Sequence, residues 1–193
     1  MPFYLTGDPA DALKSAIRDF QRSPTNAKYF IQSNKRTEFS DVMLQGDIWK
    51  NFPIYDFSSD NRRNDISGIV VSNSCDVSRE NKREIPAKIS FCPLVPLSKI
   101  ETLLAKEVDK KSVESKIESI KRQQTTQFFY LPAQEPLNVD CVINLSDIHS
   151  IDAGYYCKSA SSSKFLTLSQ FGFYLLTFKL SVHFCRQHEN VQR

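Results

Sequence analysis

Gly68-Ile69-Val70-Val71 is a short, mostly β-branched apolar run that stops abruptly at Ser72-Asn73-Ser74-Cys75-Asp76. So apolar a run predicts a strand that is buried on both faces. The segment after it is small and polar, and it carries one thiol and one carboxylate. Side chains at the exit of a rigid strand are held in place and still reach solvent, so this segment is a candidate functional site.

The chain has 193 residues, of which 40% are hydrophobic and 24% are charged, and its formal net charge is +3. This composition predicts one globular domain over residues 1–193. The five glycines form neither a Walker-type nor a dinucleotide-binding pattern, so no cofactor is predicted. The mild positive charge permits nucleic-acid binding without requiring it.

The five cysteines are odd in number and form no C-x-x-C pair, which predicts reduced thiols in a cytoplasmic protein. The apolar segment 174–185 contains Lys179 and His183 and is too short to span a bilayer, so no membrane is predicted. His183, Cys185 and His188 lie close in sequence, but helical positions two and five apart do not share one face. No metal site is therefore predicted.

The predicted elements follow from capping patterns and hydrophobic periodicity. Asp8-Pro9 opens a helix, and Ser98-Lys99-Ile100-Glu101 has the form of a capping box. Residues 174–184 fit a helix or an alternating strand, and their length favours the helix. The expected organisation is an N-terminal helix over 8–22, barrel strands over 42–97, a helical insertion over 98–124, further strands over 126–168 and a C-terminal helix over 169–187.

Three motifs resemble, in their order, the MazF/PemK toxin family: Gly46-Asp47-Ile48-Trp49, Gly68-Ile69-Val70-Val71-Ser72-Asn73 and Phe91-Cys92-Pro93-Leu94-Val95-Pro96-Leu97-Ser98. The resemblance covers residues 42–99 and implies a small SH3-like barrel that cleaves single-stranded RNA. The expected fold class is therefore mainly β with α, an SH3-like barrel with helices at both ends and one helical insertion.

The resemblance also places candidate catalytic residues. The family's catalytic arginine precedes the second strand, where this chain has Ile66; Arg62 and Arg63 lie just upstream, in a predicted exposed loop over 58–65. Ser98 stands where the family has a threonine. Such a ribonuclease needs a cation for the phosphorane charge and a proton-transfer partner, so Arg62, Arg63 and Ser98 are the candidate catalytic residues.

Cations and aromatics interleave in the same region, as they do in many nucleic-acid grooves. Trp49, Arg62, Arg63 and Lys88 are therefore candidate nucleic-acid-binding residues. The competing interpretation is a core tryptophan among ordinary solvated charges.

A longer series of motifs resembles uncharacterised prokaryotic proteins that share an S-x-S-C-D segment. The motifs are Q-G-D-I, V-V-S-x-S-C-D, C-P-L-x-P-L and F-F-Y-L-P, followed by a C-terminal helix with L-S-x-F and F-C-R. This resemblance implies no activity.

Two alternative functions remain open. In the first, Val113, Ile117 and Ile120 are anchors on a helix that docks a protein partner, such as an antitoxin or a subunit of a defence complex. A second copy of the chain is a further expected partner.

In the second alternative, Cys75 is the nucleophile of a hydrolase with His149, His183 or His188 as its base. The competing interpretation makes Ser72, Asn73, Cys75 and Asp76 structural, with Asp76 bonded to turn amides. We favour the structural interpretation, since a neighbouring carboxylate disfavours the thiolate.

Overall fold

The computed structural model describes residues 28–31, 42–56, 61–78, 81, 84–158 and 163–184, with backbone alone at 56 and 61–65. Its elements are β1 (Ile48–Asp56), β2 (Asn61–Val70), α2 (Ser74–Val77), β3 (Lys88–Pro96), α3 (Leu97–Leu104), α4 (Lys110–Lys121), β4 (Phe128–Leu131), β5 (Cys141–Asn144), β6 (His149–Asp152), α5 (Ala153–Lys158), β7 (Ser163–Leu166) and α6 (Gln170–Phe184). The predicted N-terminal helix over 8–22 lies outside the described residues.

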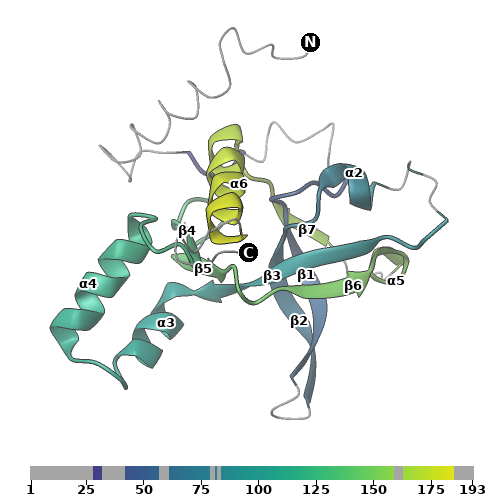
Figure 1. Ribbon diagram of the computed structural model, residues 1–193. Coiled ribbons are helices and arrows are strands. Elements are labelled where there is room, and N and C mark those ends of the chain that lie inside the picture. Colours follow the sequence, from purple (N-terminus) through teal and green to yellow (C-terminus); the bar gives the residue numbers. More distant parts are fainter. Residues whose placement is uncertain are drawn as a thin grey trace, which may run out of the picture.

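The strands form one seven-stranded antiparallel sheet in the order β4-β5-β3-β2-β1-β7, with β6 also paired to β3 (Figure 1). The structure is thus a mixed α/β one, as expected at that coarser level. Among the described strands, no pairing joins β4 to β7, so the sheet is open. The pairings of the described strands therefore do not show the closed SH3-like barrel that the resemblance implies.

One face of the sheet packs against α6. Alternate residues of a strand point to opposite faces, and on this inner face Ile48, Ile69 and Ile143 join Leu175 and Leu176 of the helix in one core cluster. The helix predicted over 169–187 is confirmed as α6, which ends at Phe184 within the described residues. The length of the apolar segment, rather than its alternating pattern, correctly distinguishes helix from strand here.

The other, outer face carries two separate hydrophobic clusters. Phe52, Phe91 and Tyr156 belong to the cluster beneath α2 and α5. Leu97 and Val142 belong to the cluster beneath α3 and α4. We call these two regions the α2–α5 side and the α3–α4 side.

Two glycines are required by local geometry. Gly46 lies in a turn with a φ of +86°, and its own N–H donates to Val70 O at 2.8 Å. At Gly68, an added Cβ would come within 2.8 Å of the Phe91 ring. Its absence leaves room for the Phe52 and Phe91 rings, which stack with centroids 3.9 Å apart.

Several boundaries differ from the sequence prediction. The backbone of 61–65 is part of β2, so Arg62 and Arg63 lie in a strand and not in the predicted loop. α3 begins at Leu97 behind Pro96, so Ser98 is inside the helix and does not cap it. The helical insertion is divided into α3 and α4, and Asp109 caps α4 by accepting the Ser112 N–H.

Candidate functional site

The polar segment after β2 is used mainly to hold the backbone. Ser72 Oγ accepts the Ser90 N–H at 2.6 Å, and Ser74 Oγ accepts the Gln45 N–H at 2.9 Å. Asn73 Oδ1 accepts the Cys75 N–H at 2.9 Å and so caps α2. These bonds fix α2 against β3 and against the turn before β1.

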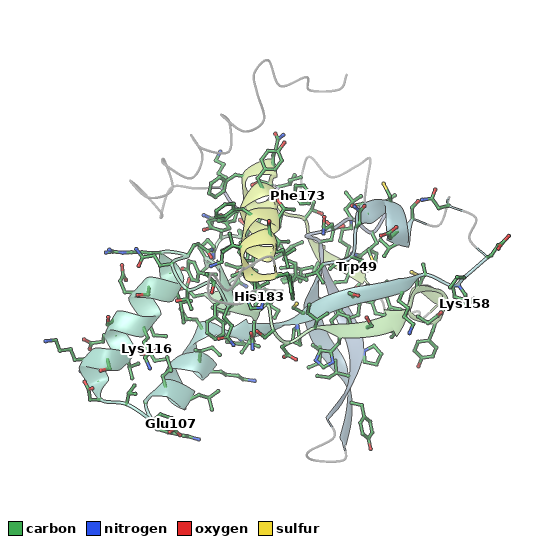
Figure 2. The ribbon with its side chains drawn as sticks, viewed as in Figure 1. Trp49, Glu107, Lys116, Lys158, Phe173 and His183 are labelled. Carbon is green, nitrogen blue, oxygen red and sulfur yellow. The ribbon has the colours of Figure 1, made fainter. Side chains whose placement is uncertain are left out.

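Cys75 and Asp76 lie on the exposed surface of α2, whereas Val77 is buried beneath it. The Cys75 thiol is therefore not packed in the core. The two described histidines have other partners: His149 bonds Asp147 at 2.9 Å and His183 bonds Ser146 at 3.2 Å. His183 is at the far end of α6 from α2 (Figure 2), and His188 lies outside the described residues.

A cleft of about 470 Å³ lies where α2, the segment before β3 and α5 meet. Its apolar lining comes from Val77, Ile85, Pro86, Ala87, Ala153 and Cys157. Its polar lining comes from Ser78, Asn81, Asp152 and Lys158. Pockets of this size and mixed lining are typical of small-ligand sites.

The polar groups of the cleft are only partly used by the protein itself. Asp152 Oδ1 accepts the Tyr155 N–H at 2.7 Å and so starts α5, and Asn81 Nδ2 donates to Cys75 O at 2.5 Å. Within the part of the chain that the structure describes, no ion pair involves Asp152 or Lys158. Lys88 is the cross-strand neighbour of Asp152, which puts a predicted nucleic-acid-binding residue beside this cleft.

A second candidate surface is a two-stranded ribbon formed by 53–56 of β1 and 61–65 of β2. β3 pairs with β2 only at 68–70, and β7 pairs with β1 only at 48–50. The ribbon therefore extends beyond the other described strands (Figure 1). Tyr55 is 44% exposed, and its cross-strand partner is Arg62; Ile54 is paired with Arg63.

The three candidate catalytic residues are not gathered in one place. Ser98 is exposed on α3, and α3 and the ribbon leave the sheet as separate projections (Figure 1). Ile66, at the position of the family's arginine, packs against the α2–α5 cluster. The backbone positions of Arg62 and Arg63 place them on the ribbon, away from Ser98.

Trp49 is a core residue and not an exposed stacking platform. Its side chain is 8% exposed and meets the Tyr156 ring edge-on with centroids 6.3 Å apart. Lys164 Nζ lies 5.8 Å from the Trp49 ring and 2.7 Å from Asp47 Oδ2, a buried ion pair that the sequence did not reveal. Burial raises the pKa of Asp47, and the bond from Lys164 limits that rise.

The proposed partner anchors are also core residues. Val113 and Ile120 are 5% and 3% exposed, and Ile117 packs with Ile120 against the chain's own β4 and β5. An apolar stripe at helical spacing is explained here by intramolecular packing. Val113 and Ile120 are thus buried in the chain itself, and Ile117 is half-buried against the same cluster.

On the α3–α4 side a carboxylate is fully engaged. Asp140 Oδ1 accepts bonds from the Tyr130 hydroxyl and the Ala133 N–H, both at 2.9 Å, and Lys121 Nζ lies 3.3 Å from Oδ2. Burial acts to raise the pKa of Asp140, but these bonds outweigh it and hold the pKa below its ordinary value. The adjoining cavity of about 390 Å³ is thus lined by groups already paired with one another.

Lys179 is a buried cation on α6. Its ammonium donates to Gln123 O at 3.0 Å and to Thr125 O at 2.5 Å, and its side chain is held against the segment that follows α4. Burial lowers the pKa of Lys179 to about 8. The lysine therefore joins α6 to the loop between α4 and β4.

Comparison with protein-family models and with curated proteins gives no match. Among the described residues, no helix is long and apolar enough to cross a membrane. In the same part of the chain, no three histidine, cysteine or acidic side chains are grouped so that they could hold a metal ion.

Proposed function

We propose that this protein binds single-stranded RNA through the ribbon, as its resemblance to the MazF/PemK family implies. The observation that carries the proposal is the exposed Tyr55 with Arg62 as its cross-strand partner, on a ribbon that extends beyond its neighbours. Two-stranded ribbons are a known way for proteins to reach into nucleic acids. Proteins that hold single strands combine base stacking on aromatics with cations along the backbone.

The charge of the ribbon sets the expected binding mode. Arg62 and Arg63 are accompanied in sequence by Asp56, Asp60 and Asp65, so this surface has no strong positive field. Binding is expected to depend on stacking and on two local guanidinium–phosphate contacts. Each such contact contributes roughly −0.7 to the slope of log affinity against log salt, so we expect a slope of about −1.4.

The proposal is limited to binding. Ser98 and the ribbon stand apart, and Ile66 occupies the position of the family's catalytic arginine. A cation and a proton-transfer group must act on one phosphodiester, and these candidates are not side by side. Purified protein is therefore expected to bind RNA without cleaving it.

The test is fluorescence anisotropy with a labelled single-stranded RNA of mixed sequence. The double variant Arg62→Ala, Arg63→Ala should weaken binding about 100-fold or more, since bonds to charged groups contribute about 1.5–3 kcal/mol each and two are removed. The matched control is Lys110→Ala, Lys111→Ala, which removes two exposed cations from α4. Equal losses in the two double variants, or no binding by the wild-type protein, would overturn the proposal.

A further inference from the structure

The cleft on the α2–α5 side differs from the ribbon in shape and in chemistry. It is a concave site of about 470 Å³, whereas the ribbon is a projection. Its apolar lining can cover the face of a flat ring. The polar residues Asn81, Asp152 and Lys158 add hydrogen-bonding groups of both kinds around that lining.

We propose that this cleft binds one unstacked purine nucleotide, with guanine preferred, at a subsite separate from the ribbon. The inference rests on the proposed function in that the natural ligand is taken to be single-stranded RNA. Sequence-specific recognition of RNA generally uses bases that are splayed out of the stack and read at their edges. A concave site with partly unused polar groups suits such a base.

Asp152 determines the expected base preference. An ionised carboxylate only accepts hydrogen bonds, and here one oxygen already accepts the Tyr155 N–H. The remaining lone pairs favour a base edge with adjacent donors, which guanine presents through its N1–H and N2 amino groups. Uracil presents its single N3–H between two carbonyl oxygens, and a carboxylate repels those oxygens.

Lys158 supplies the phosphate contact. It ends α5 on the rim of the cleft, and Figure 2 shows it at the opposite end of the molecule from Lys116. Its ammonium has no ion-pair partner among the described residues, so no internal carboxylate competes with a phosphate. Lysine binds phosphate as a point charge, so this contact should strengthen the binding of all nucleotides equally.

The segment Ser72–Asp76 gains a role from this assignment. Its side chains do not touch the ligand in our proposal. Through Ser72, Asn73 and Ser74 they fix α2, whose last residues line one wall of the cleft. These residues are positioning residues for the site.

The experiment is a titration of the full chain with guanosine and uridine 5′-monophosphates, followed by amide chemical shifts. Saturable shifts at Asn81, Gly154 and Lys158 are expected with guanosine monophosphate, and about tenfold weaker binding with uridine monophosphate. Lys158→Ala should weaken both by a similar factor, whereas the exposed control Lys116→Ala should change neither. Asp152→Asn should remove most of the preference for guanosine while leaving the fold intact, since asparagine also caps helices.

The outcomes separate this inference from the proposed function. The ribbon variant Arg62→Ala, Arg63→Ala should bind RNA more weakly and should still bind guanosine monophosphate in the cleft. If the wild-type protein binds RNA but neither mononucleotide shifts the cleft amides, the cleft is not a nucleotide subsite. A cleft that serves a side chain of a protein partner would give that same negative result, and equal affinity for the two nucleotides would overturn the role of Asp152.

Discussion

On the α3–α4 side of the sheet, Asp140 is bonded to Tyr130, Ala133 and Lys121. On the α2–α5 side, Asp152 gives one oxygen to a backbone N–H, and no described cation pairs with it. Both sides cover the same outer face of one sheet. One carboxylate serves the stability of the fold, while the other keeps hydrogen-bonding capacity that a ligand can use.

The hydrophobic residues on the two sides differ in the same way. Ile120 is 3% exposed on the α3–α4 side, whereas Ile85 is 80% exposed at the cleft. An aliphatic side chain as exposed as Ile85 contributes little to folding but is available to a ligand. Residues of one chemical type therefore have different roles at the two ends of this face.

The strongest test of this comparison is a pair of identical truncations. Ile120→Ala should lower the free energy of unfolding by about 2–5 kcal/mol, because it opens a cavity in a packed cluster. Ile85→Ala should change it by less than about 0.5 kcal/mol, because the side chain is in solvent. Urea denaturation of the two variants measures both values, and similar losses would show that the two sides are not distinct.

A second pair of variants compares the carboxylates. Asp140→Asn should cost about 1–3 kcal/mol, because it removes a charge-assisted acceptor from three donors. Asp152→Asn should cost less than about 0.5 kcal/mol, since asparagine can replace its capping bond.

The pH dependence gives the control for Asp140. Its folded pKa is lowered, so its contribution to stability is present above the ordinary aspartate range and is lost as the pH falls through the folded value. The wild-type protein should therefore lose its advantage over Asp140→Asn on acidification. A difference that stays constant down to the acid transition would contradict this assignment.

Lys179 carries a buried charge on α6, which packs against the inner face. Its hydrogen-bond acceptors among the described residues are the backbone carbonyls of Gln123 and Thr125. The unfolded chain keeps this lysine protonated up to its ordinary pKa of 10.5, whereas the folded chain releases the proton from about 8. Between these values the unfolded state binds more protons, so the free energy of unfolding gains a term that rises with pH, by at most about 1.4 kcal/mol per unit. The difference between the wild-type protein and Lys179→Met, measured by denaturation from pH 7 to 10, should show this rise.

The smallest expected effect concerns the cysteines. Cys75 is exposed, whereas Cys92 and Cys141 are buried, and burial raises their pKa values to about 12 and about 11. Native protein should therefore be alkylated at Cys75 before Cys92 and Cys141, and Cys75→Ser should change stability by less than about 0.5 kcal/mol. Mass spectrometry of the peptides measures the order; a Cys75 rate that plateaus well below a pH of about 8.5 would instead indicate an activated thiol.

Local patterns in the sequence predicted the local elements well. In the apolar run before Ser72, Gly68 to Val70 form the end of β2 and Val71 follows it. The length of the last apolar segment correctly favoured a helix, α6, over a strand. The Ser98-Lys99-Ile100-Glu101 pattern predicted a helix at this place, and α3 begins one residue earlier, at Leu97. Signals of this kind need no knowledge of distant partners.

The cleft and the open arrangement of the sheet could not be predicted in this way. The cleft brings Val77, Ser78, Asn81 and 85–87 together with residues of α5, which are distant in sequence and are held there in part by the pairing of β3 with β6. The pairing of Asp47 with Lys164 is similarly long-range. Aromatic and aliphatic residues suit a core and a binding face equally well, which is why the sequence does not reveal that Trp49 is buried.

The chain has one tryptophan, and its place makes the two sides spectroscopically unequal. Trp49 contacts Tyr156 of α5 beneath the α2–α5 side, and the α3–α4 side has no indole of its own. Intrinsic tryptophan emission therefore follows only one half of the outer face. Its unfolding curve coincides with that of the far-ultraviolet dichroism only if the two halves unfold as one cooperative unit.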